Sequence, residues 1–326
     1  MEEIPVEELK IGMYVHLDLA WYEHPFLKNH FHISSSESLK KIKGLGLKTV
    51  KIDPSKSQNG SSKSIAEFED DGEPPSTPVV PEELLEAIHD RRLEKKEKAR
   101  LIQQHAITMM KNLLENPNPS SIREVKKGAH AIVDLILKDQ ETTFHLVNIT
   151  DHDYSTYTHS VNVGLVATAL AKAAFRHSYS HDLHALGAGF LLHDLGKVKV
   201  GLDIINKPGK LTDEEMKIMK RHPAMGYFLL QEAKQMNMEY KLIVLHHHEK
   251  IDGTGYPSGI KGNDIHIYAR LCTIADIFDA LTSVRPYKQP MTSFEALKLM
   301  RKEMVPQHIQ QDLFEKFVLM FQAPYR

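Results

Sequence analysis

The part of the sequence that decides the fold begins with the stretch Leu191-Leu192-His193-Asp194-Leu195-Gly196-Lys197. Four further motifs follow up to residue 288. Three contain histidines, acidic residues or glycines, and the last is basic: His222-Pro223, His246-His247-His248-Glu249-Lys250-Ile251-Asp252-Gly253-Thr254-Gly255-Tyr256-Pro257, Ala275-Asp276-Ile277-Phe278-Asp279 and Arg285-Pro286-Tyr287-Lys288. Imidazoles and carboxylates thus recur at the ends of apolar, helix-like segments. A helical fold can bring such ends together around metal ions, so the stretch predicts a helical domain with a metal site.

Length and composition limit the class of protein. The 326 residues suffice for two domains, and a hydrophobic content of 41% can fill a sizeable core. A net charge of -2 gives no general attraction to a nucleic acid polymer or an acidic membrane. The single cysteine, Cys272, lies in an apolar run and predicts a buried small side chain rather than a nucleophile. We find no signal peptide and no run of roughly 18 apolar residues, so a soluble, cytoplasmic protein is expected.

Residues 1–54 predict a small mixed α/β module. Residues 13–19 alternate as in a strand, residues 38–43 favour a short helix, and residues 49–53 favour a second strand. Trp21 lies in an aromatic segment for which local packing is favoured over contact with a partner. Residues 55–81 are rich in Ser, Gly, Pro and acidic side chains, which is typical of a flexible linker.

Residues 82–140 predict connecting helices. Pro81 suits the first turn of a long helix over 82–115, whose charged middle indicates a solvated surface or, alternatively, a signalling or dimerising helix. A second helix follows the break at 117–119, with apolar residues at helical spacing: Ile122, Val125, Ala129, Ile132 and Ile136. Residues 141–326 predict an all-α domain, in which Thr212 with Glu215 and Thr292 with Glu295 match capping boxes. The fold class is therefore mainly α, with a small α/β module and a long linker helix ahead of the helical domain.

His193 and Asp194 predict a two-metal site rather than a single chelate. Adjacent helical residues diverge by about 100°, so the pair serves two neighbouring ions, with both oxygens of Asp194 forming the bridge. His159, His247-His248 and Asp276 supply the further ligands that such a site needs. Two ions about 3.5–4 Å apart suit phosphodiester hydrolysis, because they lower the pKa of a bridging water and neutralise phosphate oxygens. Mixed imidazole and carboxylate ligands fit iron, manganese, nickel or zinc better than magnesium or calcium.

Together, these motifs resemble the HD-GYP family, a branch of the HD-domain phosphohydrolases that hydrolyses cyclic di-GMP. The resemblance covers about residues 147–321. Residues 4 to about 130 resemble the uncharacterised domain often found ahead of HD-GYP domains in bacterial proteins. The resemblance makes 141–326 an HD-type catalytic domain. It implies a metal-dependent phosphodiesterase that uses a bimetal-activated hydroxide to convert cyclic di-GMP to pGpG and, slowly, to GMP.

The resemblance also implies the ligands of two divalent transition metals, iron or manganese first, with nickel or zinc possible. Its first-ion ligands are His159, His193, Asp194 and Asp276, and its second-ion ligands are Asp194 as the bridge, His222, His247 and His248. Asp194 and Lys197 are the implied catalytic residues, with Lys197 stabilising charge on the phosphate or protonating the leaving oxygen. Asp279 is expected to orient a ligand or a basic neighbour. Some members hold a third metal through a glutamate four residues before the first histidine. This chain has Ser155 there, with Asp153 nearby, so two ions are expected.

The substrate side is assigned to a glycine-punctuated loop and a basic motif. Gly255, Tyr256 and Pro257 let backbone approach a ligand and offer a ring and a hydroxyl. Arg285 and Lys288 suit phosphate or the guanine edge, although a basic helix end is the plainer interpretation from the residues alone. Lys197 is counted as a substrate contact as well.

Two other functions remain open from the sequence. One is a cyclic-dinucleotide receptor with negligible turnover, and the other is a phosphohydrolase acting on another nucleotide such as cyclic GMP-AMP. A homodimer is possible. The residues do not decide the metal or its redox state, the final product, or the role of the N-terminal module.

Overall fold

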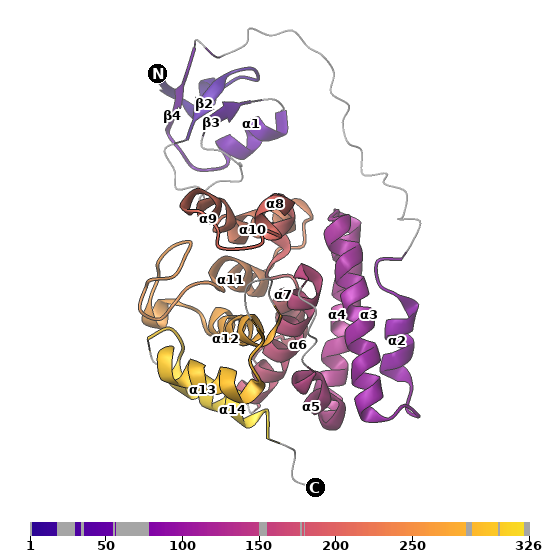
Figure 1. Cartoon of the computed structure of the whole chain (residues 1–326). Coiled ribbons are helices and arrows are strands. Elements are labelled where there is room, and N and C mark those ends of the chain that lie inside the picture. Colours follow the sequence, from indigo (N-terminus) through magenta and orange to yellow (C-terminus); the bar gives the residue numbers. More distant parts are fainter. Residues whose placement is uncertain are drawn as a thin grey trace. The chain divides into compact units, whose positions relative to one another are not determined.

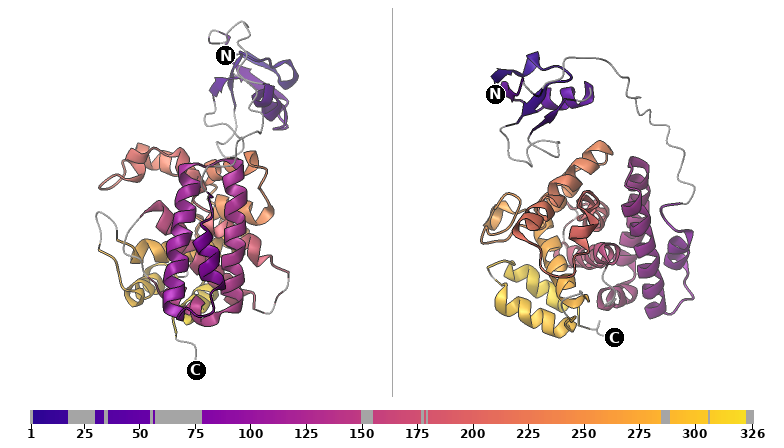
Figure 2. Two further views of the ribbon diagram at one scale, coloured as in Figure 1. Left: turned by 90° about the vertical axis from the view of Figure 1, so that its right-hand side faces the viewer. Right: turned by 45° about the horizontal axis from the view of Figure 1, so that its top comes forward.

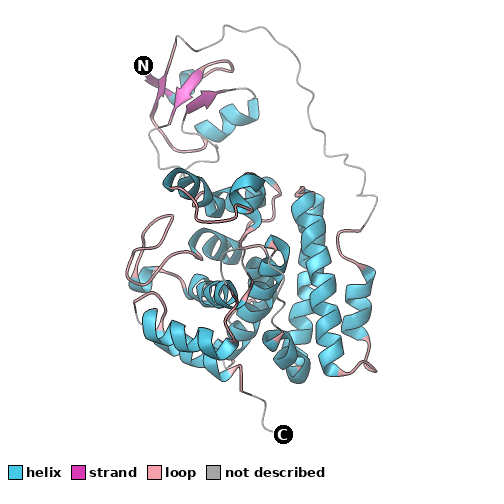
Figure 3. Ribbon diagram, viewed as in Figure 1, coloured by secondary structure: helices cyan, strands magenta, loops and turns pink. Residues whose placement is uncertain are grey.

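The computed structural model describes residues 2–17, 30–33, 36–54, 56, 78–149, 155–176, 178, 180–284, 289–305 and 307–322. The chain divides into two compact units, residues 1–73 and 74–326, which are considered separately. Among the described residues, strands occur only in the first unit, and the second unit is helical (Figure 3). The chain is therefore mainly α with a small α/β module, as its patterns predict. Trp21 and most of the expected linker lie outside the described residues.

The N-terminal unit contains a four-stranded antiparallel sheet with the order β1-β4-β2-β3. Its elements are β1 (Glu2–Pro5), the 3-10 helix η1 (Val6–Glu8), β2 (Tyr14–His16), β3 (His30–His32), α1 (Ser36–Lys43) and β4 (Thr49–Ile52). Val15, Ile42, Val50 and Ile52 form part of one buried apolar cluster. The predicted strands and short helix are confirmed, whereas β1 and β3 are additional.

The prediction of one helix over 82–115 is wrong, because this segment forms two helices, α2 (Glu82–His89) and α3 (Lys95–Glu115). The Asp90 side chain accepts the backbone N–H of Arg92 at 2.7 Å, which closes a turn after α2. The Glu94 side chain then caps α3 by accepting from the N–H of Glu97. The charged run is therefore a turn and a helix start, and Lys98 within it is 5% exposed.

The second unit continues with α4 (Pro119–Lys138) and α5 (Gln140–Asn148). The apolar residues predicted to line α4 are all buried. The remaining elements are α6 (Thr156–Ala174), α7 (Leu183–Leu191), η2 (Leu195–Lys199), α8 (Leu202–Ile205), α9 (Asp213–Met219), α10 (His222–Glu232), α11 (Met238–His246), η3 (Gly262–Asp264), α12 (Ile267–Thr282), α13 (Ser293–Glu303) and α14 (Gln311–Leu319). Both expected capping boxes are present, at the starts of α9 and α13.

Helix α6 forms the centre of the helical unit. It is apolar around most of its circumference, with every residue from Thr158 to Ala171 buried, as expected of a helix enclosed on all sides. Helices α3, α7 and α12 pack against it, and α2 to α4 stand side by side along one flank (Figures 1 and 2). Polar residues on α6 therefore face other elements rather than water. No helix in the described part of the chain has the length and apolar character to cross a membrane.

Candidate metal centre

The turn after α7 places His193 and Asp194 in the interior, at 0% and 1% exposure. The chain there continues into η2, and Gly196 lies directly on the first turn of α10. A Cβ atom at Gly196 would overlap the carbonyl oxygen of His222, so only glycine allows this approach. The approach puts Nε2 of His222 3.1 Å from Oδ1 of Asp194. A glycine at this position therefore brings two distant motifs together.

Three histidines are oriented in the same way, each by a backbone carbonyl three residues earlier. The Nδ1 atoms of His193, His222 and His247 lie 2.7, 2.9 and 3.0 Å from the oxygens of residues 190, 219 and 244. A carbonyl oxygen only accepts, so each Nδ1 carries the proton and each Nε2 presents a lone pair. The Nε2 atoms of His222 and His247 are 3.2 Å apart. Two facing lone pairs repel unless a cation lies between them.

Burial keeps the imidazoles on the α10 and α11 side neutral. It lowers the pKa of His222 and of His247, and it lowers the pKa of His248 further. His193 Nε2 and both carboxylate oxygens of Asp194 are buried without a hydrogen bond of ordinary geometry among the described residues. Imidazole nitrogens converging on a buried carboxylate are the donor set of a transition-metal site. The residues present therefore fit the metals that the sequence implies.

Asp194 belongs to both groups of side chains that could hold an ion. One group is His159, His193 and Asp194, and the other is Asp194, His222, His247 and His248. Burial raises the pKa of Asp194, but Lys197 and the neighbouring histidines lower it by more, so the carboxylate is ionised. Two buried His/Asp clusters that share one carboxylate are consistent with a binuclear centre.

Asp276 on α12 completes the set of expected ligands. Its Oδ1 lies 3.3 Å from Nε2 of His159, and its Oδ2 lies 3.5 Å from Nδ1 of His248. Burial raises the pKa of Asp276, but the hydrogen-bonding contact with His159 lowers it by more, to well below its usual value. Asp279, one turn later, contacts His159 Nδ1 at 2.7 Å. The structure thus brings together all seven residues predicted as ligands.

The loop after α11 carries Tyr256 against this centre. The Tyr256 ring stacks on His248 with centroids 4.6 Å apart, and it also faces His222. Gly255 has a packing role here, since a Cβ atom on it would lie 2.5 Å from the Glu249 Cα and the Lys250 backbone nitrogen. The Gly255 backbone therefore packs closely on the backbone that follows α11.

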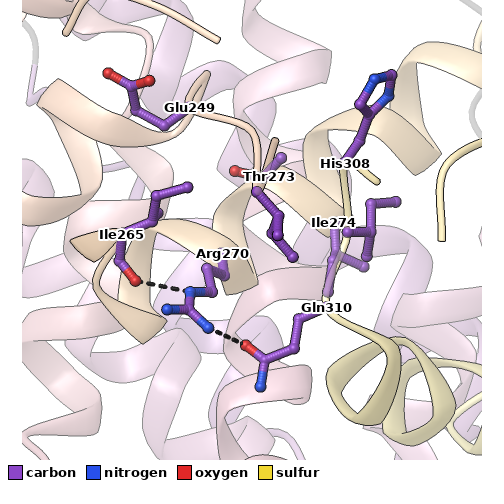
Figure 4. Close-up of a pocket in the computed structure, with 9 residues that line it drawn as sticks. Glu249, Ile265, Arg270, Thr273, Ile274, His308 and Gln310 are labelled. Atoms are coloured by element: carbon purple, nitrogen blue, oxygen red, sulfur yellow. Dashed lines mark hydrogen bonds between the residues drawn. The ribbon is translucent and has the colours of Figure 1, made fainter. Parts of the chain in front are cut away.

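Two polar side chains, the buried Glu249 and the half-buried Arg270, hold that loop in place. The Glu249 carboxylate, 1% exposed, accepts the Ser258 backbone N–H at 2.7 Å, and burial raises its pKa. Arg270 donates to the carbonyl of Ile265 at 2.7 Å and to the side chain of Gln310, beside a small pocket that Glu249 also lines (Figure 4). These bonds fix both ends of the segment between α11 and α12, and so the position of Tyr256.

One lysine lies at the centre, and a second lies beside the Tyr256 ring. Lys197 Nζ is 2.5 Å from Asp194 Oδ2, with its side chain 15% exposed. The ammonium of Lys220 lies 5.3 Å from the centroid of the Tyr256 ring, within reach of a cation–π interaction. Lys220 was not predicted as a site residue; its place next to the His222-Pro223 motif was the available signal. Ser155 caps α6 by accepting the N–H of Thr158.

Three predicted positions lie outside the described residues: Arg285, Lys288 and Asp153. Two buried amides behind the centre were missed, Gln103 on α3 and Asn162 on α6. Gln103 is a polar residue among apolar neighbours on α3, and Asn162 lies one turn after His159 on α6; these were the signals that could have identified them.

Comparison with known proteins places this arrangement in a family. Residues 145–313 match the HD domain, and residues 2–127 match a domain of unknown function, DUF3391. The chain is 32% identical to cyclic di-GMP phosphodiesterase PA4108 of Pseudomonas aeruginosa, over 92% of this chain and 72% of that protein. It is 36% identical to 3'3'-cGAMP-specific phosphodiesterase 2 of Vibrio cholerae, over 51% of this chain and 32% of that protein. The fold is also similar to that of Bd1817, an HD-GYP-type protein of Bdellovibrio bacteriovorus, with a TM-score of 0.60, 21% identity and 97% coverage of both chains. The chain therefore belongs to the HD-GYP branch of the HD-domain family, with a DUF3391 domain ahead of its HD domain.

Proposed function

We propose that the chain is a phosphodiesterase that hydrolyses cyclic di-GMP to pGpG and, slowly, to GMP. The observation that carries this proposal is the sharing of Asp194 between two buried clusters of imidazole and carboxylate groups. A pair of divalent metals held there would supply Lewis acidity and a water of lowered pKa. The similarity to a protein named as a cyclic di-GMP phosphodiesterase supports the substrate.

The side chains around the clusters have separate tasks in this proposal. One ion would be held by His159, His193 and Asp276, and the other by His222, His247 and His248. Asp194 would bind both ions. The ammonium of Lys197, beside Asp194, would stabilise charge that develops on the phosphate or protonate the leaving oxygen.

Substrate contacts are proposed on the loop side of the centre. Tyr256 would form a wall of the substrate site, since its ring already packs on His248. Gly255 and Pro257 shape that wall. Lys220 adds a cation over the ring, suited to a phosphate of the anionic dinucleotide. Arg285 and Lys288 stay predicted contacts to phosphate or guanine.

Iron or manganese is the proposed metal, with nickel or zinc as alternatives. The argument is the donor set, in which imidazole nitrogens outnumber carboxylates, because such sites favour first-row transition metals over magnesium and calcium. A cytoplasmic location and a homodimer both stay predictions.

The test is an anaerobic assay with protein reconstituted separately with iron(II) and manganese(II). Cyclic di-GMP is supplied, and the products are resolved by chromatography beside an Asp194→Asn variant. The expected result is metal-dependent formation of pGpG that the variant lacks. Tight binding of cyclic di-GMP to protein that holds two metals, with no product, would instead establish a receptor.

Cyclic GMP-AMP is the second candidate substrate, favoured by the similarity to a 3'3'-cGAMP-specific enzyme. The same assay run with both dinucleotides decides between them. A kcat/KM for 3'3'-cGAMP more than tenfold above that for cyclic di-GMP would replace the proposed substrate.

A further inference from the structure

A chain of buried side chains connects α3 with the metal centre. The Gln103 Nε2 donates to Oδ1 of Asn162 at 2.8 Å, and Nδ2 of Asn162 donates to Oδ1 of Asp279 at 2.8 Å. Oδ2 of Asp279 then accepts from Nδ1 of His159 at 2.7 Å. The exposed fractions of the four residues are 4, 8, 5 and 3%, so water has little access to any of these bonds.

The direction of every bond in this chain is fixed by its chemistry. The Asp279 carboxylate can only accept, so its two neighbours, His159 and Asn162, must both donate to it. The amide of Asn162 therefore turns its NH2 toward Asp279 and its oxygen toward Gln103, which must donate. The proton on Nδ1 of His159 leaves Nε2 as the atom that faces Asp194 at 3.2 Å and Asp276 at 3.3 Å. Nε2 is thus the atom that would bind a metal.

The position of Gln103 is costly for an amide. Its neighbours on the buried face of α3 include Ile102, Ala106 and Met110, all at 0% exposure. Burying a polar group without a partner costs about 1–3 kcal/mol, and an apolar residue would avoid that cost altogether. Gln103 fits this face only through its bond to Asn162.

We propose that Gln103 is a positioning residue that sets the orientation of His159 through Asn162 and Asp279. The proposal rests on the proposed function only in that His159 binds a metal. Without the Gln103 donor, the oxygen of Asn162 is buried and unpaired, and the amide is no longer held with its NH2 on Asp279. The carboxylate then loses one of its two orienting bonds, and His159 loses the fixed partner of its Nδ1. The position of α3, on which Gln103 lies, is thereby linked to the metal centre.

The test uses Gln103→Met and Gln103→Glu, with Gln104→Met as the matched control. Methionine keeps the length of the side chain without a donor, and at pH 8 glutamate keeps its shape but turns a carboxylate toward the oxygen of Asn162. Gln104 is the next residue of α3 and is exposed. For each protein, the affinity for manganese(II) is measured by competition with a chelator, unfolding in urea with EDTA reports the metal-free stability, and kcat and KM are measured separately.

In both Gln103 variants, we expect the affinity of at least one of the two manganese-binding steps to fall by about 10–100-fold, as for other groups that support metal ligands. The KM should stay within twofold, and Gln104→Met should match the wild type throughout. A folded Gln103 variant with wild-type manganese affinity would overturn the proposal. If neither variant folds without metal while Gln104→Met does, the amide serves stability alone, and the proposal fails as well. If the wild-type protein binds manganese but does not hydrolyse cyclic di-GMP, only the proposed function is wrong. The comparison of manganese affinities still decides the role of Gln103.

Discussion

Nδ1 of His159 lies 2.7 Å from Oδ2 of Asp279, and both side chains are buried at the junction of α6 and α12. A buried carboxylate behind an imidazole fixes the tautomer of the ring and makes its far nitrogen a better metal ligand. The two residues are 120 positions apart, so this relationship depends on the packing of α12 against α6.

Asp279→Asn should weaken metal binding by about 10–100-fold and lower kcat by a similar factor. An amide cannot accept from both neighbours, because its NH2 must face either His159 or Asn162, each of which donates. Chelator competition and steady-state kinetics measure the two effects, with the exposed Asp312→Asn as the control. An Asp279→Asn protein that binds manganese as tightly as the wild type would show that the pair does not orient a ligand.

Lys220→Ala should raise KM for cyclic di-GMP several-fold and leave kcat within twofold. The ammonium lies over the Tyr256 ring, on the proposed substrate side of the centre. We therefore expect it to contribute to substrate binding rather than to chemistry. The control is Lys217→Ala, because Lys217 is exposed and pairs with Glu214 at 2.7 Å. The KM of the wild type should rise more steeply with salt than that of Lys220→Ala. Equal KM values for both lysine variants would show that Lys220 does not contribute to substrate binding.

The candidate metal centre was more predictable from the sequence than the residues that support it. Metal ligands are restricted to a few residue types, so His193-Asp194 and His247-His248 are recognisable at a glance, and the structure places them together. Gln103 carries no such restriction. Its partner Asn162 is 59 residues away, and only the packing of α3 on α6 determines which residues meet.

Local patterns also failed where short elements depend on distant partners. The strand β3 has three residues, and neither its sequence nor that of β2 indicates that the two strands pair. The break between α2 and α3 is stabilised by side-chain bonds of Asp90 and Glu94 to nearby backbone N–H groups, which the charge pattern of the segment hides. The helical character of residues 141–326 was easier to predict, because long apolar runs such as those of α6 and α12 recur there.

Gly196→Ala should destabilise the metal-free protein by about 1–3 kcal/mol and reduce the number of bound metals. The added methyl group would meet the backbone of His222 and Gly226, which cannot move without separating η2 from α10. Gly201→Ala is the control, because there the methyl group meets only the flexible side chain of Asp203. Urea unfolding in EDTA gives the stability, and elemental analysis gives the metal content. Wild-type stability and two metals in Gly196→Ala would contradict the packing argument.

Asp139→Asn should cost about 1 kcal/mol of unfolding free energy at pH 7, and this difference should disappear in acid. Asp139 caps α5 by accepting the N–H of Thr142 at 3.0 Å, and it pairs with Lys95 at 2.7 Å. Asparagine keeps a capping oxygen but loses the charge, so the variant isolates the ion pair.

The pH dependence of that difference follows from the pKa of Asp139. Burial raises this pKa, but hydrogen bonds from Lys95 and Thr142 outweigh burial and hold it below the usual aspartate value. A depressed pKa in the folded state means that the stabilisation is complete above about pH 4 and is lost as the pH falls through the folded-state pKa. Urea unfolding of wild type, Asp139→Asn, Lys95→Met and the double variant, at steps from pH 7 to pH 3, isolates the pairwise contribution. A coupling energy that stays constant over this range would mean that the carboxylate charge does not stabilise the fold.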